Sequence, residues 1–430
     1  MINLEVNSKS IIFDPLLANN GIPLVLIEAS EETLLTETTE KGSLDLNVNR
    51  KGPSPELLSS PLTLSANDPH FLYPQLTGKY QVGVQSFYAD PEERLLIDVH
   101  YPGIVGQEGP KYRILPLSPE NHPMNTDGME KVQRDRLENL WTRSQPRLKP
   151  VEGNFPVVLF SHGMAYSHSD YQHLVEDLTS HGYYVITISH PASNAVSVFG
   201  TSKPPEPAQD ADKLTLAKAK DEAMQKRDDL AMLAMYEQVN DISFLIHQIR
   251  NGSYNELIGT NINVDQIGVM GHSLGGDTAL KACCEDMENL IRTGIDLDGG
   301  ALKHFETVST QKPFLTIGAE NGTYSEGPMV EGGEVILKDG EKIWEGKKII
   351  WEGRKEWDAF KMNSPQVKLC IISQATHDDF SVKPWFNAIK NELEATKVDD
   401  CNVKKKTYPE IYREIRTPIV DWFNKYLRDS

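Results

Sequence analysis

The chain of 430 residues has few cysteines, namely Cys283, Cys284, Cys370 and Cys401, and none of them forms a C-x-x-C pair. Two are neighbours in sequence, and the set has neither the spacing of a disulfide framework nor that of a zinc site. We therefore expect these cysteines to be small buried side chains in a reducing compartment.

Long hydrophobic runs are also missing. No window approaches the roughly 18 uncharged apolar residues that a membrane-spanning helix needs. Within residues 1–30, no basic segment leads into an apolar run, so no secretory signal is recognisable. These absences predict a cytoplasmic protein, and they leave open secretion of a mature form from which a signal has been removed.

Basic residues are scarce relative to acidic ones. The chain has 43 Lys and Arg against 62 Asp and Glu, a formal net charge of −19. Such a surplus repels nucleic-acid backbones and anionic lipid surfaces. We expect no nucleic-acid partner, and any peripheral contact with a membrane would have to be apolar and local. The sequence does not indicate an oligomeric state.

What the chain does contain is a series of compact, β-branched apolar runs separated by helical patterns. The runs lie at 95–101, 157–160, 184–188, 267–270, 293–298, 314–317 and 368–373. The helical patterns lie at 171–181, 238–250, 277–291 and 411–427. Continuous apolar strands are typical of a buried parallel sheet. Their alternation with helices predicts an α/β class: a mostly parallel, doubly wound sheet with helices on both faces.

The composition divides the chain into two parts. Residues 1–76 predict a β-rich or partly ordered N-terminal extension, and residues 77–430 predict the α/β domain. Insertions interrupt the domain near 104–150, 204–234 and 322–361, and an Asp339-Gly340 turn signal predicts a hairpin in the last. Loops at strand carboxyl ends build the site in such sheets. The charged helix expected near 204–234 fits a lid and a solvated helix equally well.

A G-x-S-x-G motif occupies residues 271–275, between the apolar run 267–270 and a helical pattern. Strand, tight turn and helix form the context in which this motif presents a nucleophilic serine. The glycines leave room for a strained turn, and the helix N-terminus favours developing negative charge. The motif predicts Ser273 as a nucleophile; the alternative is a structural turn with an incidental serine.

A serine hydroxyl needs a base, and in this fold the histidine follows the serine in the chain. Only His304 and His377 lie downstream of Ser273. His377 follows the run 368–373, on the loop after the last strand, where the base belongs. His304 lies in a helix-like stretch and is expected at the surface. The chain order therefore predicts His377 as the base.

Three carboxylates compete for the role of the acid that orients this histidine. Asp298 ends the run 293–298 and precedes two glycines, Asp296 lies two residues earlier on the same face, and Glu320 follows the next strand. The tip position favours Asp298, with Glu320 and Asp296 as alternatives.

Two backbone N–H groups must form the oxyanion hole. One belongs to Leu274, directly after the nucleophile. The other is expected from the His162-Gly163-Met164 turn that follows the run 157–160, with Met164 as donor. His162 precedes the serine in the chain, so we interpret it as a residue that holds this loop rather than as the base.

The remaining histidines do not suggest a metal. A group precedes the motif: His162, His168, His173, His181 and His190. Their spacing fits no zinc signature. We expect neither a metal nor another cofactor.

Over residues 77–385 the chain resembles the plasma and type II platelet-activating factor acetylhydrolases and their bacterial relatives labelled predicted dienelactone hydrolases. The matching motifs are 78–83, 99–102, 156–163, 178–185, 271–276, 295–298 and 377–380. The chain departs from the family at 189–192, where Ser-His-Pro-Ala replaces a charged E-H-R-D-like sequence. Residues 1–76 and 322–361 have no counterpart in the family.

The resemblance implies an α/β-hydrolase fold and calcium-independent hydrolysis of a short or oxidised sn-2 acyl ester of a phospholipid. It implies Ser273 as nucleophile, His377 as base and Asp298 as acid, with Leu274 and Met164 as oxyanion donors. It also favours Asp298 over Glu320. The substrate would be a small-molecule or lipid ester.

Two other functions remain open. One is a general carboxylesterase or polyester hydrolase without phospholipid preference, and the other is a catalytically silent binding scaffold. A cysteine-dependent dienelactone hydrolase is disfavoured because the motif carries Ser273.

Overall fold

The computed structural model describes residues 2–6, 9–13, 74–104, 142–164, 166–191, 213–300, 309–322, 335–338, 341–344, 360, 362–384 and 406–428. Within 2–13, 213–228 and 335–344 it describes the backbone alone. Most of the predicted extension 1–76 and of the insertions near 104–150 and 322–361 lies outside the described residues, as do the start of the 204–234 insertion, His304 and Cys401.

A nine-stranded sheet forms the centre of the molecule, in the order β13-β10-β9-β8-β6-β7-β4-β3-β5. Its strands are β3 (Gln81–Tyr88), β4 (Leu96–Gly103), β5 (Ser144–Pro146), β6 (Phe155–Ser161), β7 (Tyr184–Ser189), β8 (Ile262–His272), β9 (Ile291–Leu297), β10 (Phe314–Asn321) and β13 (Val367–Thr376). The six strands from β13 to β7 are parallel, whereas β4 is antiparallel to both β7 and β3. The mostly parallel sheet predicted from the sequence is therefore confirmed.

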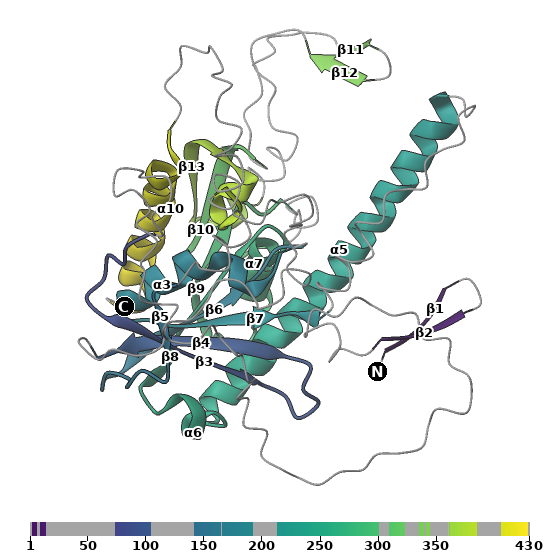
Figure 1. Ribbon diagram of the computed structural model, residues 1–430. Coiled ribbons are helices and arrows are strands. Elements are labelled where there is room, and N and C mark those ends of the chain that lie inside the picture. The colour runs from purple at the N-terminus through teal and green to yellow at the C-terminus, as the bar shows by residue number, and fades with distance from the viewer. Residues whose placement is uncertain are drawn as a thin grey trace, which may run out of the picture.

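Helices cover both faces of this sheet (Figure 1). They are α3 (Gln172–Ser180), α5 (Lys213–Arg250), α6 (Asn255–Ile258), α7 (Leu274–Glu285) and α10 (Tyr408–Phe423). Short turns are η4 (His168–Tyr171), η6 (His377–Phe380) and the π-helical η7 (Asn424–Arg428). Along β6, Val157 and Leu159 pack with α5 and α7, and Val158 and Phe160 pack with α3 and α10. This double burial explains the unbroken apolar run of the strand.

Two hairpins stand apart from the main sheet. Strand β1 (Ile2–Val6) pairs antiparallel with β2 (Lys9–Phe13) near the N-terminus. Strand β11 (Val335–Lys338) pairs antiparallel with β12 (Glu341–Trp344) on either side of the Asp339-Gly340 pair. The second is the hairpin that the Asp-Gly signal predicts. Among the described residues, no helix is long and apolar enough to cross a membrane.

Several predicted boundaries were wrong. The helix predicted over 277–291 begins earlier and ends at Glu285, because Asp286 terminates it: its carboxylate accepts the N–H of Ile291 at 2.6 Å and pairs with Lys312. Residue 291 already belongs to β9. The helical patterns near 204–234 and at 238–250 belong to one continuous helix, α5. Strands β3 and β5 were not predicted, and β5 pairs with β3 at the end of the 104–150 segment.

The carboxyl ends of the parallel strands gather the candidate residues on one edge of the sheet. The residues directly after β8, β9 and β13 are Ser273, Asp298 and His377, and residues 162–164 follow β6. These strands are neighbours or next neighbours in the sheet order. The topology therefore brings together segments that are far apart in the sequence.

The C-terminal helix α10 packs on α3 through a buried histidine. The ring of His173 lies 4.8 Å from the ring of Tyr412, whose hydroxyl donates to the His173 carbonyl at 2.8 Å. Burial lowers the pKa of His173 from 6.5 to about 3. His173 therefore stays neutral in the folded protein at pH values at which the unfolded chain binds a proton.

This burial predicts a loss of stability in acid. Because the folded pKa lies below the unfolded one, the unfolded state binds one more proton between roughly pH 6 and pH 4, and the free energy of unfolding falls by about 1.4 kcal/mol per pH unit from this group. His173→Gln should remove that contribution from the slope, measured by urea denaturation at each pH. The matched control is Tyr412→Phe, which removes the hydrogen bond to the His173 carbonyl but no imidazole, and should keep the slope. Equal slopes in wild type and His173→Gln would contradict the prediction.

Candidate active site

Ser273 stands at a strained turn between β8 and α7. Its φ of 54° and ψ of −124° place it in a region that side chains rarely adopt. Close packing surrounds the turn: a Cβ at Gly271 would lie 2.2 Å from the Gly275 carbonyl oxygen, and one at Gly275 would lie 2.1 Å from that of Ser161. The two glycines of the motif are therefore required for contact between backbones, and Ser273 itself is partly exposed.

Leu274 is the first residue of α7, so its N–H has no partner within the helix. Further along the first turn, the N–H groups of Gly276 and Asp277 donate to the carbonyl of Ser273 at 2.8 and 3.1 Å. The positive end of the helix dipole lies at the same place. This turn therefore offers one backbone donor beside the serine.

Asp298 and His377 form a hydrogen-bonded pair. Oδ2 of Asp298 lies 2.6 Å from Nδ1 of His377, and Oδ1 accepts the N–H of Ala319 at 2.9 Å. Asp298 is fully buried, whereas 35% of the His377 side chain is exposed. Because the buried carboxylate accepts at Nδ1, the other ring nitrogen is left with a lone pair that can take a proton.

The two alternative acids lie elsewhere. Oδ1 of Asp296 accepts the N–H of Gly299 at 2.7 Å, and a Cβ at Gly276 would lie 2.0 Å from the same oxygen. Glu320 is exposed, and its carboxylate accepts the N–H of Gln374 at 2.6 Å. Asp296 thus holds the turn after β9 and Glu320 fastens β10 to β13. The structure brings only Asp298 to His377.

The loop after β6 lies against the serine. A Cβ at Gly163 would come within 2.9 Å of the Ser273 Cβ. The Gly163 N–H donates to the Tyr171 hydroxyl at 3.2 Å, whereas the Met164 N–H donates to none of the described residues. Among the described residues, the N–H of Met164 thus has no partner, in contrast to that of Gly163.

His162 and His190 support the loop from within. The carbonyl of Gly163 lies 2.9 Å from Nδ1 of His162, and the His190 N–H donates to Nε2 of the same ring at 3.2 Å. Burial lowers the pKa of His162 to about 3. The contacts agree with the interpretation of His162 as a residue that holds the loop. His190 in turn lies 2.9 Å from Oδ2 of Asp241 and 3.0 Å from Oγ of Ser161.

A cluster of three side chains joins the segment that follows the β6 loop to the segment that carries His377. The Tyr166 hydroxyl donates to Asp378, and the Lys383 ammonium lies 3.2 Å from the same carboxylate and 3.6 Å from the Tyr166 ring centroid. Burial acts to raise the pKa of Asp378, but the tyrosine hydrogen bond and the lysine charge outweigh it and lower the pKa. Asp378 therefore stays charged and links the two loops.

The side chains of Ser273 and His377 form no hydrogen bond with each other in this structure. Within the described part of the chain, neither Oγ of Ser273 nor Nε2 of His377 has a hydrogen-bond partner. Among the described residues, no group of three or more His, Cys, Asp or Glu side chains is arranged to hold a metal ion.

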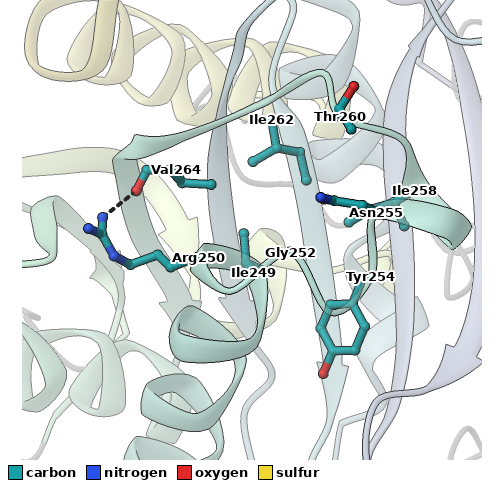
Figure 2. Close-up of a pocket in the computed structure, with 9 residues that line it drawn as sticks. All are labelled: Ile249, Arg250, Gly252, Tyr254, Asn255, Ile258, Thr260, Ile262 and Val264. Carbon is teal, nitrogen blue, oxygen red and sulfur yellow. Dashed lines mark hydrogen bonds between the residues drawn. The ribbon is translucent and has the colours of Figure 1, made fainter.

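A separate pocket of about 130 Å³ lies at the other end of β8 (Figure 2). Its lining comes from the ends of α5 and α6 and the start of β8, and Arg250 donates to the Val264 carbonyl at 2.8 Å. Since β8 runs from this pocket to Ser273, roughly 30 Å separate the two places. The pocket is not part of the candidate active site.

The sequence did not point to Tyr171, His190 or Asp241 as parts of the site. Asp241 lies in the middle of α5, where a charged residue normally faces water, and Tyr171 opens an ordinary helical pattern. The one signal was position 189–192, where the chain departs from the acetylhydrolase sequence. That departure coincides with His190, which contacts both Asp241 and His162 in the loop after β6.

Comparisons with known proteins place this geometry in context. Residues 138–326 match the family model described as "Platelet-activating factor acetylhydrolase, isoform II". The "Platelet-activating factor acetylhydrolase" of Canis lupus familiaris is 26% identical over 196 residues, which cover 40% of this chain and 41% of that protein. "Chlorophyllase-1, chloroplastic" of Citrus unshiu is 27% identical over 165 residues, covering 36% of this chain and 39% of that protein. The chain thus matches about two fifths of the length of these curated relatives.

One solved structure is similar in fold over most of this chain. The "Ferulic acid esterase from Streptomyces cinnamoneus" aligns with a TM-score of 0.51 and 18% identity, over 83% of this chain and 93% of that chain. At this identity the likeness concerns the fold alone. The chain has the α/β-hydrolase fold, and its residues 138–326 are similar to the platelet-activating factor acetylhydrolase family.

Proposed function

We propose that the protein is a serine ester hydrolase in which Ser273, His377 and Asp298 form the catalytic triad. The observation that carries the proposal is the Ser273 turn, with its positive φ, on the sheet edge where the buried Asp298 carboxylate holds His377. The relationship to acetylhydrolases over residues 138–326 supports the same chemistry.

The reaction begins with attack of Ser273 Oγ on the ester carbonyl. Nε2 of His377 accepts the serine proton and returns it to the leaving alcohol, so that an acyl-enzyme forms. Water, activated by the same nitrogen, then attacks the acyl-enzyme and releases the acid. Asp298 stays ionised and stabilises the imidazolium. The Ser273–His377 hydrogen bond forms when substrate binds, since such contacts are often long in free enzymes.

The tetrahedral intermediate carries a negative charge that two backbone N–H groups stabilise. Leu274 supplies one at the first turn of α7, and Met164 supplies the other from the loop after β6. Removal of a single donor of this kind costs about 10²- to 10³-fold in kcat in a serine protease. Both donors are backbone groups, so the direction of their N–H bonds depends on the contacts that fix the two turns.

We propose a short or oxidised sn-2 acyl ester of a phospholipid as the substrate class. The acetylhydrolase relatives support it. The second candidate is a carboxylesterase without phospholipid preference, which the similarity to a chlorophyllase favours. We propose residues 77–430 as the catalytic domain, and neither candidate function requires residues 1–76.

The triad makes a direct prediction about kinetics. Ser273→Ala and His377→Ala should abolish hydrolysis of p-nitrophenyl acetate, and Asp298→Asn should lower kcat by about 10⁴-fold because the Asn amide donates to Nδ1 and leaves the proton on Nε2, the wrong tautomer for a base. Far-UV circular dichroism checks that each variant is folded.

Glu320→Gln is the matched control for the acid. Its carboxylate fastens β13 near the site without touching His377, so kcat should stay within about threefold of wild type. If Glu320→Gln is the slow variant and Asp298→Asn is not, the acid has been assigned wrongly.

Substrate preference is decided by comparing kcat/KM for two series. One series holds sn-2 phospholipid esters with acetyl, butyryl and longer chains, and the other holds soluble esters with the same acyl groups. A phospholipid hydrolase should prefer the sn-2 series by about tenfold or more at the shortest chain, which corresponds to about 1.4 kcal/mol of extra transition-state binding. Equal values in both series would favour the carboxylesterase.

A further inference from the structure

Tyr171, the last residue of η4, connects two parts of the candidate active site. Its buried hydroxyl accepts the N–H of Gly163 at 3.2 Å and lies 2.9 Å from Nδ1 of His272. Gly163 precedes the oxyanion donor Met164, and His272 precedes Ser273. A single phenol therefore joins the oxyanion loop to the turn that carries the nucleophile.

His272 extends the connection to the base. Its second ring nitrogen, Nε2, lies 2.9 Å from the backbone carbonyl oxygen of His377, and the two imidazole rings are 4.5 Å apart. The Phe380 ring also stacks on the His272 ring, with the two centroids 5.7 Å apart. His272 is fully buried. The ring thus packs directly against the residue that must carry a proton during catalysis.

The end group on one side fixes the proton on His272: the His377 carbonyl can only accept, so Nε2 of His272 carries a proton. The buried ring is neutral, so Nδ1 accepts from the Tyr171 hydroxyl, which in turn accepts the Gly163 N–H. His272 is neutral in this arrangement, and burial lowers its pKa well below 6.5, as do the nearby His377 and Lys383.

We propose that Tyr171 and His272 are positioning residues that hold the oxyanion loop, the nucleophile turn and the base in one hydrogen-bonded unit. The inference rests on the proposed function. With the Gly163 N–H bound to Tyr171, the loop presents the Met164 N–H to the substrate. With its carbonyl bound to His272, the backbone of His377 is held while Asp298 orients its ring. A neutral His272 places no second positive charge beside the His377 imidazolium.

The test is Tyr171→Phe, which removes the hydroxyl and keeps the ring that packs on Phe160 at 4.7 Å. The loop after β6 then keeps its contact with His162 but loses the hydrogen bond from the Gly163 N–H to Tyr171. The resulting misplacement of the Met164 N–H should lower kcat for p-nitrophenyl acetate by about 10- to 100-fold. The KM of Tyr171→Phe should stay within about twofold of wild type, since binding of the substrate in its ground state does not depend on the hydrogen bonds of Tyr171 and His272. The matched control is Tyr412→Phe, which loses a buried hydrogen bond to the His173 carbonyl and should keep kcat.

A double-mutant cycle separates positioning from general stability. His272→Gln keeps an amide donor for the His377 carbonyl, but its single amide group cannot also place an acceptor at the Nδ1 position that the Tyr171 hydroxyl contacts. Adding Tyr171→Phe to it should therefore cost little more in kcat than His272→Gln alone. Additive losses, or a Tyr171→Phe variant that loses stability like Tyr412→Phe while keeping kcat, would overturn the inference and leave the proposed function intact.

Spectra of the wild type with ¹⁵N-labelled histidine keep the two hypotheses distinguishable. The proposed hydrogen bonds require His272 to be the neutral Nε2–H tautomer at pH 7. A protonated ring or an Nδ1–H ring would overturn the inference. If the wild type hydrolyses no ester, the proposed function fails. The same spectra then still decide whether Tyr171 and His272 form the proposed hydrogen bonds.

Discussion

The hydrogen bond between Asp298 and His377 joins residues 79 positions apart, and the candidate active site depends on it. Strand β10 lies between the strands that carry them. The N–H of Asp298 donates to the carbonyl of Ile317 on β10, and Ala319 of the same strand donates to the Asp298 carboxylate. The register of three parallel strands therefore sets the 2.6 Å contact, and a shift of one residue would turn the side chain to the other face.

Close backbone packing is the second constraint. The loop after β6 contacts the nucleophile turn at distances that only glycine permits, as at Gly163 and Gly275. Polar groups buried by this packing need partners, and neutral histidines provide them: His162 under the loop and His272 behind the serine. Each accepts through one ring nitrogen and donates through the other, so each can be satisfied without burying a charge.

The sequence predicted those parts of the fold and site that leave local signals. Buried strands are unbroken apolar runs, and Ser273 lies in a motif whose strand, turn and helix are all visible in the sequence. The structure also brings Asp298 to His377. The sequence could not predict Asp241 beneath His190, or Tyr171 between Gly163 and His272, because such contacts arise from the packing of distant segments. Strand β5 was missed because its three residues carry no apolar pattern.

The central claim is that Ser273 is an activated nucleophile. Labelling with a fluorophosphonate probe, followed by peptide mapping, tests it without knowledge of the substrate, because such probes react with activated serines. An activated Ser273 should give one labelled peptide that contains it, and His377→Ala should take no label. A folded wild-type protein that takes no label, or a label on another serine, would contradict it.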